Sequence, residues 1–127
     1  MDTGIKHVIE TKVTNEKTAV AMSSGTLSVF ATPAMIALIE ETAWRSVVPY
    51  LEKGQCTVGT RLDISHVAPT PCGMAVKCET ELIEVDGRKL KFKADVYDET
   101  GLIGTGTHER FIVNSEKFQA KADSKRS

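Results

Sequence analysis

The chain has 127 residues, a length typical of one domain, and its apolar fraction of 41% is ordinary for a globular protein. Its 16 basic residues nearly balance 17 acidic ones, which argues against nucleic acid or an anionic membrane as the main partner, because both require a basic surface. The N-terminal residues contain no apolar segment of a secretion signal, and the longest apolar run, residues 34–39, is far shorter than the roughly 20 residues of a membrane helix.

The three cysteines, Cys56, Cys72 and Cys78, contain no CxxC pair. An odd number of cysteines without a secretion signal favours reduced thiols over disulfides, and the same spacing argues against a zinc site. We therefore expect a cytoplasmic protein without a zinc site.

Two short strands are predicted first in the chain, over residues 5–13 and 18–22, with turn-like Asn15 between them. A helix follows, with Thr32 as its N-cap and Pro33 as its first helical residue. It extends through residues 34–48 and should weaken near Pro49, because proline disfavours helix for the residue before it. Its first half is apolar on all sides, which predicts that it lies buried.

The remainder reads as a meander of strands. Residues 57–67, 76–82, 90–96 and 103–113 alternate between apolar and polar positions or form β-rich runs. Asp86-Gly87 is a strong hairpin signal, and residues 99–101 form another turn. Strands segregated from one long helix indicate an α+β domain. A single helix covers part of such a sheet, so we also expect a dimer.

The domain is predicted to span residues 1–115. Residues 116–127 are charged and almost free of large apolar side chains, so they are predicted to form a weakly ordered tail that can begin with a helical turn.

Three polar residues stand where chemistry is possible, and each has a plainer explanation. Glu40 follows an apolar run on the helix, where a desolvated carboxylate gains reactivity, but Glu40 and Glu41 together can mark the solvent side. His66 lies at the end of a predicted strand and on its inward face. It is either a proton-transfer residue or a histidine bonded to a backbone carbonyl. Thr32 lies where a helix N-terminus favours an oxyanion, although capping alone explains a threonine there.

Glycines mark two further positions. Gly59 lies inside a strand, where it permits a bulge or a close ligand, and its N–H can serve as an oxyanion donor. Residues 104–110 (GTGTHER) are small and polar for a strand, which fits close approach by a ligand or a second subunit, or a solvated strand face.

Together these segments resemble one family. Residues 29–35 (VFATPAM), 38–40 (LIE), 49–51 (PYL), 58–60 (VGT), 64–71 (ISHVAPTP), 104–110 and 116–118 (EKF) resemble the fluoroacetyl-CoA thioesterase-like hotdog proteins in order and spacing. The resemblance covers nearly the whole chain. It implies a hotdog fold, in which an antiparallel sheet wraps a long helix, and a homodimer that can associate further. It also implies hydrolysis of a short-chain acyl-CoA without a metal or an organic cofactor.

The same resemblance implies site residues. The family's Thr/Glu/His catalytic set falls on Thr32, Glu40 and His66, so it favours Glu40 over Glu41. Substrate contacts fall on the positions that match the quoted motifs, which are Gly59, Val29, Phe30 and Arg110.

One segment departs from the fluoroacetyl-specialised enzyme. Residues 22–28 (MSSGTLS) contain none of the phenylalanines that help that enzyme to enclose its acyl group, so a different acyl substrate and a more polar entrance are expected. Three other interpretations stay open: an acyl-CoA hydratase or dehydratase in the same fold, an acyl-CoA binding protein without turnover, and a purely structural dimer.

Overall fold

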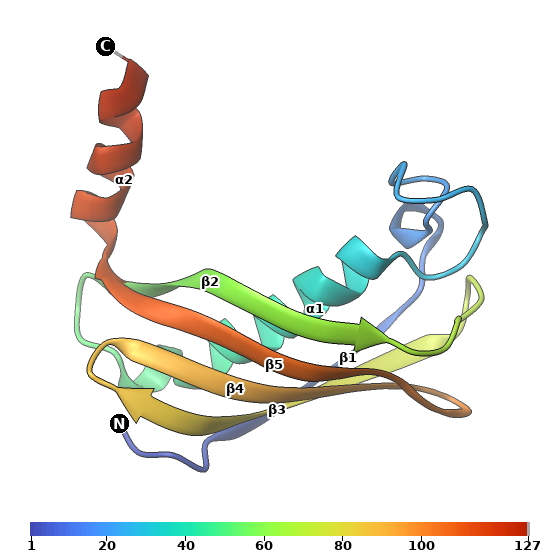
Figure 1. Ribbon diagram of the computed structural model, residues 1–127, viewed down its shortest axis with the longest axis horizontal. Helices are drawn as coiled ribbons and strands as arrows, with labels where there is room; N and C mark the ends of the chain where they lie inside the picture. The colour runs from blue at the N-terminus through green and yellow to red at the C-terminus, as the bar shows by residue number, and fades with distance from the viewer. Residues whose placement is uncertain (127) are drawn as a thin grey trace.

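The computed structural model describes residues 1–126 and forms one antiparallel sheet with a long helix along one face (Figure 1). The strands lie in the order β1-β3-β4-β5-β2, so β1 and β2 form the edges. Their bounds are β1 Lys6–Lys12, β2 Gln55–His66, β3 Ala75–Asp86, β4 Lys89–Asp98 and β5 Gly101–Asn114. Helix α1 spans Thr32–Val47, and α2 spans Ser115–Asp123. Short 3-10 turns occupy Asn15–Lys17, Val48–Tyr50 and Ser124–Arg126. The predicted α+β class and the helix wrapped by a sheet are confirmed.

Turn chemistry fixes the centre of the sheet. β3 and β4 pair antiparallel from Val76 with Asp98 to Asp86 with Lys89, so the hairpin predicted at Asp86-Gly87 is confirmed. Gly87 has a φ of +61°, a left-handed conformation that glycine adopts without steric cost.

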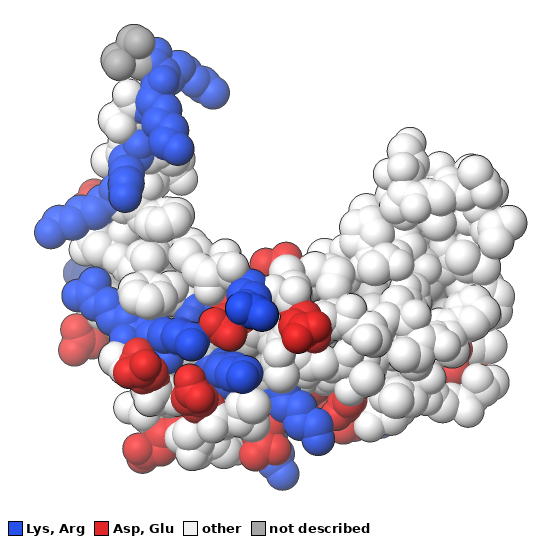
Figure 2. Space-filling model, viewed as in Figure 1, with Lys and Arg blue, Asp and Glu red and all other residues white. Residues whose placement is uncertain are grey.

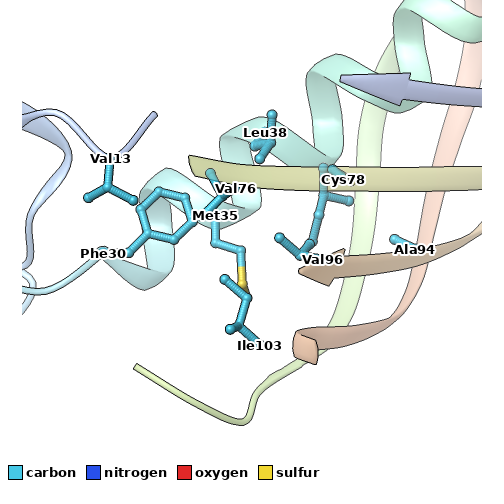
Figure 3. Packing of buried hydrophobic residues seen from close by; sticks show 10 residues of the cluster. Val13, Phe30, Met35, Leu38, Val76, Cys78, Ala94, Val96 and Ile103 are labelled. Carbon is cyan, nitrogen blue, oxygen red and sulfur yellow. The ribbon is translucent and has the colours of Figure 1, made fainter. Parts of the chain in front are cut away.

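The core lies between α1 and the sheet (Figure 3). Met35 and Leu38 of α1 meet apolar side chains from β3, β4 and β5, among them Val76, Val96 and Ile103. A Cβ added at Gly104 of β5 would lie 2.6 Å from the sulfur of Met35, which is closer than real Cβ contacts. The missing side chain at Gly104 therefore lets the first turns of α1 rest directly on β5.

The strand predicted over residues 18–22 is wrong. Thr18 makes one isolated bridge with Phe30, and the chain from Ala19 to Val29 folds back on itself as a loop. Local hydrogen bonds replace a strand ladder there: the hydroxyl of Thr18 donates to the carbonyl of Asn15, and the amide of Met22 donates to the carbonyl of Thr18.

The start and the exposure of the helix also differ from the prediction. Ala31 is the N-cap, with no side-chain cap bond, and Thr32 is the first helical residue. The first half of α1 is not wholly buried, because Pro33 and Ala37 are exposed and Ile36 is half-buried. Since the single sheet covers one side of the helix, no part of residues 1–126 covers this apolar stripe.

The end of the chain is helical beyond the single turn that the sequence suggests. α2 begins after Asn114, whose side chain accepts a hydrogen bond from the amide of Lys117, and none of its residues is buried. Figure 2 shows basic side chains along this helix. The last residue of the predicted tail, Ser127, lies outside the described residues.

A hollow separates α2 from the loop that precedes α1, and β2 lies along its floor (Figures 1 and 2). As an edge strand, β2 has one side without a neighbouring strand within the described chain. Leu62 within β2 and Val67 just after its last residue are apolar and solvent-accessible.

Candidate active site

Thr32 and His66 form the first polar pair. The hydroxyl Oγ1 of Thr32 lies 2.8 Å from Nδ1 of His66. Because Thr32 is not the N-cap, its hydroxyl is not spent on the amides of its own helix, and it joins α1 to the last residue of β2 instead. We call these two residues the threonine–histidine pair.

The other ring nitrogen of His66 is shielded from solvent and has no hydrogen-bond partner among residues 1–126. Burial lowers the pKa of His66 from its ordinary value, because the charged imidazolium is disfavoured away from water. The imidazole is therefore neutral at neutral pH, and its Nε2 is available to a group that the protomer does not supply.

Val29 and Phe30 lie beside this pair. They line an open cleft together with Thr32, His66 and Pro69. The Phe30 ring meets the His66 ring edge to face, with centroids 6.5 Å apart, and Phe30 as a whole is buried in the core. The structure thus brings two of the predicted substrate contacts to the threonine–histidine pair.

Glu40 belongs to a second cluster, farther along α1. Its Oε2 lies 3.5 Å from Nη1 of Arg110 on β5, and a Cβ at Gly59 of β2 would lie 2.7 Å from the same oxygen. The Glu40 side chain is 38% exposed, whereas that of Arg110 is 6% exposed. We call Glu40, Gly59 and Arg110, with His108 described below, the glutamate–arginine cluster.

The neighbouring carboxylate points elsewhere. Glu41 forms an exposed ion pair with Arg45 one turn later, at 2.8 Å, which is an ordinary helix-surface contact. The sequence pattern could not tell Glu40 from Glu41. In the structure the two side chains differ in direction: Glu40 faces the buried arginine and Glu41 faces solvent.

Arg110 is held in place by β2 and β5. Its Nε donates to the hydroxyl of Thr57 at 2.8 Å, and its Nη2 donates to the carbonyl of Thr57 at 2.9 Å. Burial lowers the pKa of Arg110, and the charge of Glu40 opposes that effect. The guanidinium is therefore a fixed cation that compensates the Glu40 carboxylate.

Sequence reasoning missed His108. It is fully buried on β5, and its Nε2 lies 3.1 Å from Nη1 of Arg110. The segment 104–110 was interpreted as a close-approach surface or a solvated face, and the solvated face is wrong for His108 and Arg110, which are both buried. Their spacing of two residues, which places both side chains on one face of a strand, was the available signal.

The two clusters lie apart within one protomer. Thr32 and Glu40 are separated by about 12 Å along α1, at about 1.5 Å of rise per residue. His66 and Gly59 are separated by roughly 23 Å along β2, at about 3.3 Å per residue. One chain therefore does not bring the predicted catalytic set, Thr32, Glu40 and His66, to a single point.

Other chemistry finds less support. Among residues 1–126, no group of three or more His, Cys, Asp or Glu side chains is placed to hold a metal ion. Burial raises the pKa of the Cys78 thiol to about 11, which makes it a poor nucleophile, and the other two cysteines are also free thiols. No helix within the described residues has both the length and the apolarity to cross a membrane.

The chain was compared with known proteins. A family described as fluoroacetyl-CoA-specific thioesterase matches residues 13–116. The fluoroacetyl-CoA thioesterase of Streptantibioticus cattleyicolor is 42% identical over 97 residues, which cover 76% of this chain and 70% of that protein.

Solved structures agree. A structure of the fluoroacetyl-CoA thioesterase FlK superposes with a TM-score of 0.94 at 35% identity, over 98% of this chain and 97% of that one. A thioesterase superfamily member from Thermus thermophilus superposes with a TM-score of 0.90 at 28% identity, over 98% and 93% of the two chains. With its hotdog architecture and this similarity over most of its length, the chain belongs to the fluoroacetyl-CoA-specific thioesterase family.

Proposed function

We propose that the protein is a homodimeric thioesterase that hydrolyses a short-chain acyl-CoA to the free acid and CoA. The observation that carries the proposal is the threonine–histidine pair, which fixes one nitrogen of a neutral imidazole and leaves the other unpartnered. Family membership supplies the thioester chemistry, because its named relatives are acyl-CoA thioesterases.

Each active site takes its groups from two copies of the chain. A carboxylate and an imidazole that act on one acyl carbon must both lie within about 3.5 Å of the reacting atoms. The distance between Glu40 and His66 in one protomer does not allow this. A two-fold axis solves the problem, because in a symmetric interface each surface contacts the same surface on the partner, so two equivalent sites form.

Two features of the described chain support such an interface. The unpaired edge of β2 presents backbone donors and acceptors to a second strand, and the apolar stripe of α1 at Pro33, Ile36 and Ala37 flanks Glu40. A second copy of the chain could enter the hollow between α2 and the loop that precedes α1 (Figure 2).

The chemistry follows from one nucleophile, Glu40, and one base, His66, at the same thioester. The Glu40 carboxylate attacks the acyl carbon, the C–S bond breaks, and CoA leaves as its thiolate, giving an acyl anhydride on Glu40. Water then attacks the same acyl carbon while Nε2 of His66 takes its proton, which releases the acid and restores the carboxylate. The imidazolium returns that proton to the CoA thiolate, so the cycle consumes one water.

Hydrogen bonds orient these groups. Nδ1 of His66 carries a hydrogen and donates it to Oγ1 of Thr32, which keeps Nε2 as the acceptor. The amide of Gly59 and the N-terminus of α1 are the donors for the negative charge that develops on the thioester oxygen. Val29 and Phe30 line the acyl entrance, and a cytoplasmic location fits both an acyl-CoA substrate and the free thiols.

The test is thiol release from a panel of short acyl-CoAs by the wild type and by the Glu40→Gln, His66→Ala and Glu41→Gln variants. We expect turnover of at least one acyl-CoA, its loss in the first two variants, and wild-type rates in Glu41→Gln, which removes an equivalent charge one residue away. Saturable binding without thiol release by the wild type would instead favour a binding protein, and loss of an enoyl-CoA chromophore without thiol release would favour a hydratase.

A further inference from the structure

The glutamate–arginine cluster contains a buried histidine to which the proposed reaction gives no part. His108 is 0% exposed, and its two ring nitrogens both have partners: Nδ1 lies 2.8 Å from the backbone oxygen of Arg61, and Nε2 lies 3.1 Å from Nη1 of Arg110. The same Nη1 lies 3.5 Å from Oε2 of Glu40. The contacts form a continuous chain from the β2 backbone to the carboxylate.

We propose that His108 is a positioning residue of the thioesterase: it orients the guanidinium of Arg110, and Arg110 in turn fixes the Glu40 carboxylate for attack. This inference rests on the proposed function, because it concerns how the reacting carboxylate is aimed.

The contacts fix the tautomer of His108. A backbone carbonyl can only accept a hydrogen bond, so the hydrogen of the ring lies on Nδ1 and points to Arg61. The lone pair of Nε2 is then left to accept from Arg110, which can only donate. Burial lowers the pKa of His108, which keeps the ring neutral and preserves that acceptor.

The donor inventory of Arg110 shows what His108 controls. Nε and Nη2 are taken by Thr57, which fixes the near edge of the guanidinium. Nη1 carries two hydrogens, and its nearest acceptors are Nε2 of His108 and Oε2 of Glu40. When His108 takes one hydrogen, the other is directed at Glu40, so the histidine sets the geometry of the contact with the carboxylate.

Water is a poor substitute at this position. His108 is fully buried and packs at a tilt against Phe92, with ring centroids 6.3 Å apart. Without its nitrogen, a hydrogen of a buried guanidinium loses its acceptor, which is costly enough to drive the group toward another one. The other acceptor that Nη1 contacts is the Glu40 carboxylate itself. A closer contact between them would move the carboxylate out of the orientation that it needs for attack.

The bulge in β2 makes this contact available. The pairing of β2 with β5 shifts register between Gly59 and Arg61, next to the carbonyl that receives the Nδ1 hydrogen. Gly59, at the start of this irregularity, is also the residue that approaches Glu40, so the approach to the carboxylate and the anchor of its orienting histidine lie two residues apart on β2.

The experiment compares three variants of the full chain in thiol release. His108→Leu keeps an apolar side chain but removes the acceptor. His108→Gln keeps an oxygen that can accept from Arg110. Phe92→Leu loosens the same part of the core and leaves all hydrogen bonds of the cluster in place. For each we would measure kcat, KM, the melting temperature and the ¹⁵N NMR signals of the Arg110 guanidinium.

We expect His108→Leu to lose about tenfold to a hundredfold in kcat with little change in KM, as misaimed reacting groups do. His108→Gln should recover most of that loss, and Phe92→Leu should keep kcat close to wild type even where its melting temperature falls as far as that of His108→Leu. Since Nη1 contacts two acceptors, we expect it to rotate slowly in the wild type and in the Gln variant, and to rotate faster in the Leu variant.

A wild-type kcat in His108→Leu would overturn the inference, and so would equal losses in His108→Leu and Phe92→Leu with no recovery by Gln. If the wild type releases no thiol from any acyl-CoA, the proposed function fails first. The guanidinium signals then decide separately whether His108 orients Arg110: signals unchanged in His108→Leu would overturn it.

Discussion

The hydroxyl of Thr32 lies 2.8 Å from Nδ1 of His66, which ties the first residue of α1 to the last residue of β2. Helix α1 and strand β2 thereby share a polar contact at one end of the helix, and they meet again at Glu40 and Gly59. The orientation of the imidazole depends on it, because the opposite nitrogen of the ring has no partner within residues 1–126.

Removing that contact should impair the reaction more than the fold. Thr32→Val keeps the shape of the side chain but leaves Nδ1 without its partner, so we expect kcat to fall about tenfold or more, a size common for groups that assist proton transfer. Thr32→Ser, which keeps the hydroxyl, is the matched control and should retain most activity. Equal rates in the Val and Ser variants would show that the hydroxyl has no such role.

Mixing two inactive variants tests the two-subunit site. In a heterodimer of Glu40→Gln and His66→Ala chains, one site carries both changes and the other carries neither. Random exchange of subunits should therefore restore about a quarter of the wild-type rate, because half of the dimers are mixed and each has one intact site. A site contained in one chain would regain no activity on mixing.

The His66→Ala variant tests whether Glu40 acts as the nucleophile or as a general base. If Glu40 is the nucleophile and His66 assists the attacking water, this variant should release one CoA per site in a rapid burst and then stall. Mass spectrometry should find the acyl group on the peptide that contains Glu40. A variant that releases no burst would assign Glu40 as the base that activates water.

Gly59 should be intolerant of any side chain for a local reason. A Cβ there lies 2.7 Å from Oε2 of Glu40, at the end of a side chain that can swing away at little cost to folding. Gly59→Ala should therefore keep its melting temperature while kcat drops about tenfold to a hundredfold, as a shift of about 1 Å in a reacting group can cause. Thr60→Ala, at the adjacent exposed residue, serves as the control, and a fully active Gly59→Ala enzyme would contradict this account.

Stability should fall as the pH is lowered from about 7 to 5. Burial lowers the pKa of both His66 and His108 in the folded chain, whereas an unfolded histidine titrates near 6.5. Below that pH the unfolded chain binds more protons, so protons favour unfolding, and carboxylates titrate mostly below this window. Melting temperatures at fixed protein concentration should show the fall, and it should be smaller in His108→Gln. A profile as steep in that variant as in the wild type would exclude His108 as a source.

Local chemistry made much of the fold predictable. Asp86-Gly87 specifies its hairpin within a few residues, and Pro33 marks the beginning of α1. Residues 18–22 were mistaken for a strand because Thr18 and Val20 favour strands, yet the hydroxyl of Thr18 bonds to a nearby carbonyl and supports a turn. Such competition between local and ladder hydrogen bonds is not visible in a residue pattern.

The sequence allowed the residues of the site to be named, but not their arrangement in space. The resemblance selected Glu40, and the structure turns that residue toward Arg110 while Glu41 pairs with Arg45. The burial of His108 depends on how β2, β4 and β5 pack around it, and a polar residue in a strand reads equally well as solvated. The distance between His66 and Glu40 depends on tertiary geometry, so sequence reasoning could name both residues without placing them.

The contact between Met35 and Gly104 links the evolution of the core to that of the reaction. Any side chain gained at position 104 would need the space that the Met35 sulfur fills, so either Met35 takes another rotamer within the packed core or α1 lifts from β5. Thr32 lies one turn before Met35, so the lifted helix would carry its hydroxyl away from His66. A larger residue at position 104 is therefore accommodated most easily together with a smaller residue at position 35, and a substitution that folding tolerates at either position can still be eliminated by selection for turnover.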